Sequence, residues 1–136
     1  MSRMLILADN DVGGAVAALR RVLESQEWVE FTRLLDLRFV GFADVGLARD
    51  ASDRTVWDTC QEVEAVLITG NRASGTESLE QTLRNHAGPD SLPVVTISDP
   101  QRVRRDRAYA RECAVSLLDL LDRIEALRGT RRLFIP

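Results

Sequence analysis

Two short apolar runs, each followed at once by polar residues, constrain the fold of this chain most strongly. The runs are Met4–Ala8 and Ala65–Ile68. An uninterrupted apolar run of this length is typical of a strand that is covered on both faces of a parallel sheet. The first run leads into Asp9-Asn10-Asp11 and the second into Thr69-Gly70-Asn71. Because such sheets bind ligands beyond the carboxyl ends of their strands, these exits are the first candidates for a functional site.

Segments with helical spacing lie between the predicted strands. Apolar residues recur every three or four positions, which predicts helices over residues 12–28, 28–37 and 76–83 and one long C-terminal helix over about 101–128. Another helix, capped by Ser52 or Asp50, places Val56, Trp57, Cys60 and Val63 on a buried stripe. Aromatic and β-branched content predicts further strands over residues 39–43, 93–97 and, at an edge, 132–135.

Strands that alternate with helices predict the α/β class. The 136 residues are 45% hydrophobic, which fits one domain over residues 1–136 around a single core. We therefore expect one three-layer domain with a mainly parallel sheet of four or five strands. The apolar runs are far shorter than the ~20 residues that cross a bilayer, and the N-terminus lacks a long apolar stretch. A cytoplasmic protein without a membrane partner is expected.

The basic residues exclude several activities, because all 18 of them are arginines. Without lysine the chain has no phosphate-binding loop of the Gly-Lys-Ser/Thr type and no Schiff-base amine. His86 is the only histidine and lies where a helix should end, so a hydrolytic triad or a zinc site is not supported. Cys60 and Cys113 lack the spacing of metal ligands and are predicted to be buried free thiols.

Four aspartates stand where one edge of the predicted sheet should gather them. Asp9 and Asp11 follow the first strand, Asp99 follows the strand over residues 93–97, and Asp53 begins a helix. Carboxylate oxygens at one edge of a sheet are suitable ligands for a divalent cation. Each aspartate also has a structural interpretation, as a turn former, a helix cap or a partner of the helix dipole.

The order of these motifs resembles that of the PIN-like domains. The motifs are Leu7–Asp11, Gly46-Leu47 followed by Ser52-Asp53, and Val66–Arg72. The resemblance covers roughly the first hundred residues by order of elements, and each motif is weak alone. It is closest to small bacterial PIN-like proteins related to toxin-type ribonucleases.

The resemblance implies a metal-dependent endoribonuclease that uses Mg²⁺ or Mn²⁺, as the toxin of a toxin–antitoxin pair with RNA as substrate and an antitoxin-like protein as partner. The family's first acid matches Asp9, and the acid that opens its central helix matches Asp53. After the second apolar run the family usually has Thr-x-Asp-x-Asp, whereas this chain has Thr69, Asn71 and Ala73. The implied catalytic residues are therefore Asp9, Asp53 and Asn71.

Two carboxylates that the resemblance leads one to expect are missing. Asn71 still offers a neutral oxygen, and Asp11, Glu77 or Asp99 would restore negative charge around a cation held by Asp9 and Asp53. Glu77 has a structural interpretation too, as a first-turn acid of its helix. The alternative function is a catalytically inactive module that binds nucleic acid or protein.

Candidate RNA-binding residues are arginines, although the net charge of −3 provides no general positive field. One guanidinium group can bind two phosphate oxygens at once, and a cluster of arginines follows Asp99. The candidates are Arg72, Arg102, Arg104, Arg105 and Arg107. The alternative is a solvated helix face that Asp106 and Glu112 neutralise.

Two other classes of protein share parts of this pattern. Receiver domains also have acids after the first strand, but they need a phosphoacceptor aspartate and a lysine, and here the matching strand ends in Thr69-Gly70-Asn71. A homo-oligomer or protein-binding module would use the leucine-rich terminal helix. The sequence does not separate such an interface from an intramolecular contact, since both need the same apolar stripe.

Overall fold

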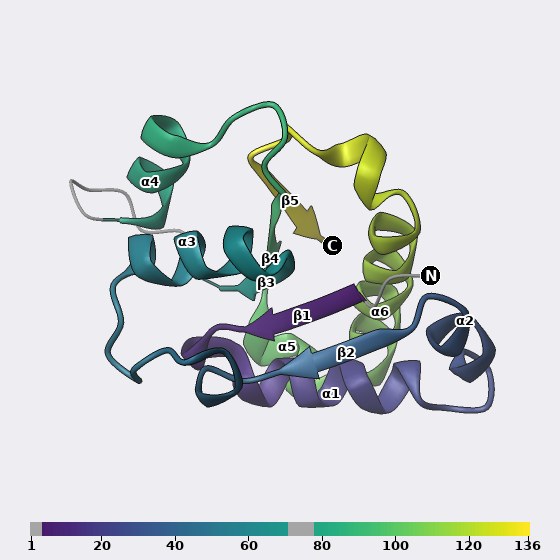
Figure 1. Ribbon diagram of the computed structural model, residues 1–136. Coiled ribbons are helices and arrows are strands. Elements are labelled where there is room, and N and C mark those ends of the chain that lie inside the picture. The colour runs from purple at the N-terminus through teal and green to yellow at the C-terminus, as the bar shows by residue number, and fades with distance from the viewer. Residues whose placement is uncertain (1–3, 71–77) are drawn as a thin grey trace.

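The computed structural model describes residues 4–70 and 78–136 and contains one parallel sheet. The strand order is β2-β1-β3-β4-β5. The strands are β1 (Met4–Ala8), β2 (Leu37–Val40), β3 (Ala65–Thr69), β4 (Val94–Ile97) and β5 (Arg132–Ile135). The predicted α/β class and three-layer arrangement are confirmed, with five strands that all run parallel (Figure 1).

Six α-helices connect the strands within the described residues. They are α1 (Gly13–Leu23), α2 (Val29–Leu34), α3 (Asp53–Val63), α4 (Leu79–His86), α5 (Pro100–Arg105) and α6 (Arg107–Asp122). Three short 3-10 helices, η1 (Asn10–Val12), η2 (Ala43–Val45) and η3 (Ile124–Leu127), complete the connections. None of the helices in this part of the chain combines the length and apolarity needed to cross a membrane.

The chain changes direction across the sheet at β1. It leaves β1 to form β2 on one side and then crosses to β3 on the other, so Leu5 pairs with Arg38 and with Ala65. The arrows of β1 and β2 point toward the end of the sheet at which α1 begins (Figure 1). This order is that of flavodoxin-like doubly wound folds, whose ligands bind where the direction changes. The carboxyl ends of β1 and β3 are therefore the place to look for a site.

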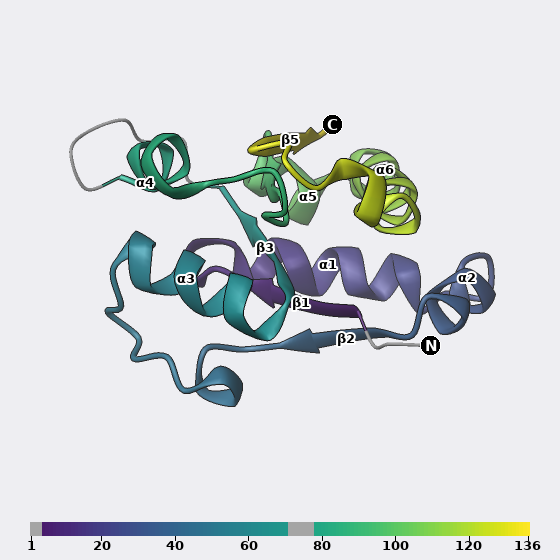
Figure 2. The same cartoon turned by 45° about the horizontal axis from the view of Figure 1, so that its top comes forward.

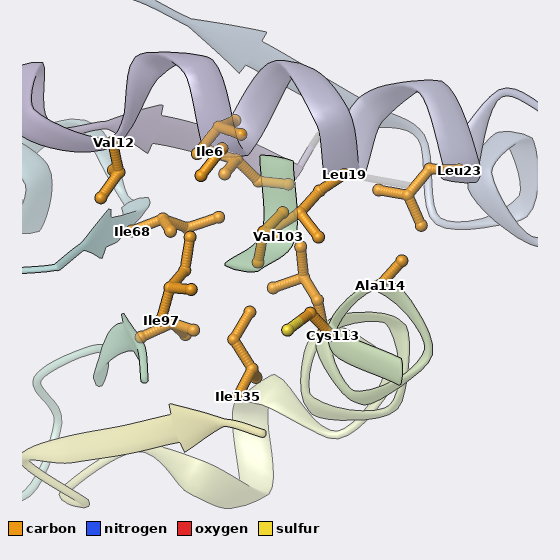
Figure 3. Close-up of a cluster of buried hydrophobic side chains, with 14 of the residues drawn as sticks. Ile6, Val12, Leu19, Leu23, Ile68, Ile97, Val103, Cys113, Ala114 and Ile135 are labelled. Carbon is orange, nitrogen blue, oxygen red and sulfur yellow. The ribbon is translucent and has the colours of Figure 1, made fainter. Parts of the chain in front are cut away.

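Helices cover both faces of the sheet. On one face α1, α5 and α6 contact one another, and Figure 3 shows Ile6, Ile68 and Ile97 of the sheet in one cluster with Leu19 of α1 and Cys113 of α6. On the other face α3 and α4 lie next to each other, away from α6, as both ribbon views show (Figures 1 and 2). Burial on both faces explains the uninterrupted apolar runs, since every residue of β3 and β4 is buried.

The first two predicted helices are shorter in the structure. α1 ends at Leu23, and the Ser25 hydroxyl donates to the Val22 carbonyl at 2.6 Å, which satisfies a carbonyl at the end of the helix. α2 ends at Leu34, and Asp36 adopts a left-handed φ of 49° before β2 begins. β2 covers 37–40 instead of 39–43, because the chain turns where the Asp44 carboxylate accepts a hydrogen bond from the Gly41 N–H at 2.7 Å.

The prediction of one long helix over about 101–128 is wrong. Asp106 has an extended backbone that separates α5 from α6, and its carboxylate accepts a hydrogen bond from the Tyr109 N–H at 3.2 Å. α6 ends at Asp122 and a 3-10 helix follows. The apolar spacing does not reveal the break, because Val103 before it and Tyr109 after it are both buried.

The remaining boundaries follow local caps. Ser52, one of the two predicted caps, caps α3, and Asp99 caps α5 with Pro100 at its start. Val63 is an exception to the predicted buried stripe of α3, because it is exposed. The helix predicted over residues 76–83 runs from Leu79 to His86 with Ser78 as its cap, whereas residues 76 and 77 lie outside the described residues.

Candidate functional site

Asp9 is fixed at the junction between β1 and β3. Its backbone N–H donates to the Ile68 carbonyl at 2.8 Å and so continues the ladder between the two strands. One carboxylate oxygen accepts a hydrogen bond from the hydroxyl of Thr69 at 2.9 Å, and the other accepts from the Asn10 N–H at 2.8 Å. Thr69 is fully buried. Asp9 is therefore a turn residue and, at the same time, a carboxylate whose orientation is set by the end of β3.

Asp11 lies close to two other carboxylates. Burial raises the pKa of Asp11, and the negative charge of Asp9 and, to a smaller extent, that of Asp53 raise it further. A hydrogen bond from the Gly70 N–H lowers it. Although Asp11 is exposed as a whole residue, this hydrogen bond shows that its carboxylate is turned toward the end of β3.

Asp53 reaches the same edge from the opposite layer. It is the first residue of α3, and the Ser52 hydroxyl fixes the start of this helix by accepting a hydrogen bond from the Thr55 N–H at 3.2 Å. Asp53 is partly buried and has interactions with its surroundings. The negative charge of Asp53 thus acts on Asp11 from the opposite layer. A cation shared by Asp9 and Asp53 stays a prediction.

Gly70 allows the end of β3 to pass close to three neighbours. A Cβ atom added at this position would lie 3.0 Å from Pro100 Cγ, 3.1 Å from Val12 Cγ1 and 3.3 Å from Asp11 Oδ2. The start of α5 is thereby packed against the exit of β3. The sequence alone does not indicate this role, because a glycine after a strand is equally common in an open turn.

Asp99 has a different role from the other three aspartates. It stands two residues after β4, and its carboxylate accepts a hydrogen bond from the Arg102 N–H at 3.1 Å, which caps α5. The charges that raise the pKa of Asp11 come from Asp9 and Asp53. The structural interpretation of Asp99 as a cap is confirmed.

Three predicted site residues, Asn71, Arg72 and Glu77, lie outside the described residues, as does Ala73. Over residues 4–70 and 78–136, no group of three or more His, Cys, Asp or Glu side chains is arranged to hold a metal ion. The charges of Asp9 and Asp53 thus act on Asp11, but the described side chains do not form a complete set of metal ligands.

The two cysteines are structural. Both are free and buried, as predicted, and burial raises the pKa of Cys60 to about 12 and that of Cys113 to about 11. The charge of Asp9 contributes to the shift of Cys60. Both thiols are protonated at neutral pH and are poor nucleophiles or metal ligands.

The candidate arginines after Asp99 differ in their contacts with the rest of the protein. Arg102 pairs with Asp106 at 3.2 Å, and its guanidinium lies 4.5 Å from the centre of the Tyr109 ring. Arg104 packs over the start of α1, where a Cβ atom at Gly14 would lie 3.0 Å from its Nε. Among the described residues, no carboxylate forms an ion pair with Arg104, Arg105 or Arg107.

Arg104 therefore connects the predicted arginine cluster to the acidic edge. It approaches the beginning of the helix that follows Asp11 and Val12. The sequence Gly13-Gly14 at the start of α1 permits such an approach, because glycine has no Cβ atom. The close approach occurs at Gly14, whereas a Cβ atom at Gly13 would meet no atom within 4 Å.

Comparisons with protein-family models, with curated proteins and with solved structures give no match. The class of protein is thus defined by its doubly wound α/β fold. Because one such fold supports many activities, function has to be argued from the residues of the site.

Proposed function

We propose that the edge formed by β1, β3 and the start of α3 is a divalent-cation-dependent nuclease site that hydrolyses phosphodiester bonds of single-stranded RNA. The observation that carries this proposal is that the carboxylates of Asp9 and Asp11 lie against the end of β3, at Thr69 and Gly70, where the strand order changes direction. The charge of Asp53 also acts on Asp11 from the start of α3. Like charges held together at a strand edge destabilise one another, and a bound cation removes that repulsion.

The chemistry of the donors fits Mg²⁺ or Mn²⁺. Asp9, Asp11 and Asp53 offer hard carboxylate oxygens, and each oxygen of Asp9 accepts one described hydrogen bond, which leaves further lone pairs. Because the described side chains form no set of three such ligands, we assign the ion to Asp9 and Asp53 with Asn71 as a neutral donor, and Asp11 would add negative charge beside it. When bound, such an ion acts as a Lewis acid on phosphate and activates water.

The other residues of the edge have supporting roles in the proposal. Thr69 holds the Asp9 carboxylate through its hydroxyl, and the N–H of Gly70 holds that of Asp11. The guanidinium groups of Arg104, Arg105 and Arg107 would bind the phosphates of the RNA strand on either side of the bond that is cleaved.

A second candidate function is RNA or protein binding without cleavage. It is favoured by Asn71 and Ala73, which stand where the PIN-like resemblance expects carboxylates. With fewer charged ligands a cation binds more weakly, and Mg²⁺ tolerates incomplete geometry poorly. In this case an antitoxin-like protein or a second copy of the chain would be the partner.

The test is cleavage of labelled single-stranded RNA by the purified protein with Mn²⁺, with Mg²⁺ and with a chelator. We expect slow cleavage that is faster with Mn²⁺, because manganese accepts mixed ligand sets more readily. Asp9→Asn and Asp53→Asn should each lower the rate by at least about tenfold, because each removes a charged ligand. Asn71→Asp should raise the rate.

The matched control is Glu62→Gln, which changes an exposed acid on α3, the helix that carries Asp53. This variant should cleave like the unchanged protein. If neither the unchanged protein nor Asn71→Asp cleaves RNA with either metal, the nuclease proposal is wrong. RNA binding that persists under those conditions would establish the second candidate function.

A further inference from the structure

A pocket of about 600 Å³ opens beside Asp53, between the start of α3 and one face of α4. The two helices that form it lie side by side in both ribbon views (Figures 1 and 2). Its size is within the range of small-molecule sites. The residues on which its chemistry depends are Asp53 from α3 and Gln81, Asn85 and His86 from α4.

Two side-chain amides line the pocket from α4. Gln81 and Asn85 are four residues apart, so they project from the same face of the helix. Each amide offers two hydrogen-bond donors and one acceptor. Within residues 4–70 and 78–136, neither amide group hydrogen-bonds to another protein group, so both are available to a ligand.

The charges of the pocket favour a neutral ligand with a polar edge. Asp53 contributes a negative charge, which disfavours a phosphate or carboxylate group. Arg54 also lines the pocket, but its guanidinium pairs with Asp58 at 3.5 Å. Among the described residues that line the pocket, His86 provides the only aromatic ring, and its imidazole is exposed. Flat rings of this kind stack on nucleobases.

We propose that this pocket binds an adenine base of the RNA strand next to the phosphodiester bond that is cleaved. Asn and Gln amides pair with adenine through two hydrogen bonds at once, and single-stranded RNA is read by bases turned out of the strand. Asp53 belongs both to the pocket and to the acidic edge, so a base in the pocket is adjacent to the site of hydrolysis. The inference rests on the proposed nuclease function for its substrate class.

The test uses adenosine, uridine and ribose as probes, followed by NMR of the side-chain amide groups in the presence of a chelator. Adenosine should shift the amide signals of Gln81 and Asn85, which are assigned by their loss in Gln81→Ala and Asn85→Ala. Each of these variants should weaken adenosine binding roughly tenfold, the effect of losing a paired amide contact. Ribose should cause no shift.

Two further variants separate the contributions of the pocket. Arg84→Ala changes an exposed residue of α4 that does not line the pocket, and it should leave adenosine affinity unchanged. His86→Ala should weaken the binding of both adenosine and uridine, because every base has a π-face that can stack. Thermal unfolding of each variant identifies any loss of fold.

Three results would overturn the inference. They are the absence of adenosine-induced shifts at Gln81 and Asn85, equal affinity for adenosine and uridine, and unchanged adenosine affinity in the folded Asn85→Ala protein. The measurement needs neither a metal nor cleavage, so its failure is distinct from failure of the nuclease proposal. Adenosine binding together with no RNA cleavage in the separate assay with Mn²⁺ and Mg²⁺ would support the pocket and refute hydrolysis.

Discussion

At the scale of single residues, the acidic edge combines fixed orientation with electrostatic repulsion. Thr69 and Gly70 hold Asp9 and Asp11 by hydrogen bonds, although the two carboxylates raise each other's energy when both are ionised. Local rules of turn formation account for Asp9 alone. The repulsion of Asp11 by the charges of Asp9 and Asp53 opposes stability, and functional sites retain unfavourable interactions of this kind.

The coupling predicts how the pKa of Asp11 responds to its neighbours. Asp9→Asn should lower the raised pKa of Asp11, and Asp53→Asn should lower it less, because the charge of Asp9 has the larger effect. Saturating Mg²⁺ should lower it as well. The measurement is a pH titration of the Asp11 carboxyl carbon by NMR, in which Glu62→Gln serves as the control.

The raised pKa of Asp11 also determines how this residue changes the stability of the protein with pH. The pKa of Asp11 is higher in the folded protein than its ordinary value of 3.8, so the folded state binds this proton more tightly. The contribution of Asp11 to the free energy of unfolding therefore falls as pH rises from 3.8 through the raised pKa. A titration in which Asp9→Asn leaves the pKa of Asp11 unchanged would refute the coupling.

At the scale of secondary-structure elements, capping side chains decide where helices begin. Ser52, Ser78, Asp99 and Asp106 each accept a hydrogen bond from a backbone N–H in the first turn of the following helix. Asp106 is the most consequential, because it divides what the apolar spacing presents as one continuous helix. The direction of α5, and with it the position of Arg104 over Gly14, follows from this division.

Replacement of Asp106 tests this cap. Asp106→Ala should lower the melting temperature by a few degrees, whereas Asp106→Asn should retain most of the stability, because asparagine caps helices as well as aspartate does. Thermal unfolding followed by circular dichroism is the measurement. Equal stability of the alanine variant and the unchanged protein would show that the break does not depend on the cap.

The effect should also depend on pH. The hydrogen bond from the Tyr109 N–H, and then that from Arg102, lowers the pKa of Asp106 below its ordinary value of 3.8. The stability that this carboxylate contributes is present above 3.8 and is lost as pH falls through the lowered pKa. The difference between Asp106→Asn and the unchanged protein should therefore shrink in acid.

At the scale of the whole molecule, one arginine connects the edge of the sheet to α4. The side chain of Arg132 on β5 is only 9% exposed. It donates to the hydroxyl of Thr96 on β4 at 2.6 Å and to the carboxylate of Glu80 on α4 at 3.0 Å. Because α4 also forms one wall of the pocket beside Asp53, this arginine supports the position of Gln81 and Asn85.

Removal of this contact should destabilise the protein substantially. Arg132→Leu leaves the buried Thr96 hydroxyl and the Glu80 carboxylate without this partner, which lowers the free energy of unfolding by about 2–4 kcal/mol. Urea denaturation measures the change. The adjacent Arg131→Leu is the matched control, since Arg131 is exposed, and it should change stability by less than about 0.5 kcal/mol. Equal effects of the two variants would contradict this role of Arg132.

Most of the fold was predictable because burial on both faces leaves a strong pattern. The runs at β1, β3 and β4 and the apolar stripe of α3 indicated the sheet and its parallel strands. The boundary at Asp106 was not predictable from spacing, since apolar residues continue in register across it. Of the candidate site, the positions of Asp9 and Asp11 after β1 and of Asp53 at the start of α3 were predictable from the strand and helix boundaries. The pocket lined by Gln81 was not, because isolated amides on a helix carry no signal.

Composition and periodicity act locally along the chain, and they were sufficient to predict the class of fold, the burial of both thiols and the chemistry that the absence of lysine excludes. The three-dimensional arrangement was needed to show that Arg104 lies over Gly14, that the charge of Asp53 acts on Asp11, and that Arg132 supports α4. Those contacts join residues far apart in the chain, and their energies depend on distances that no local pattern encodes.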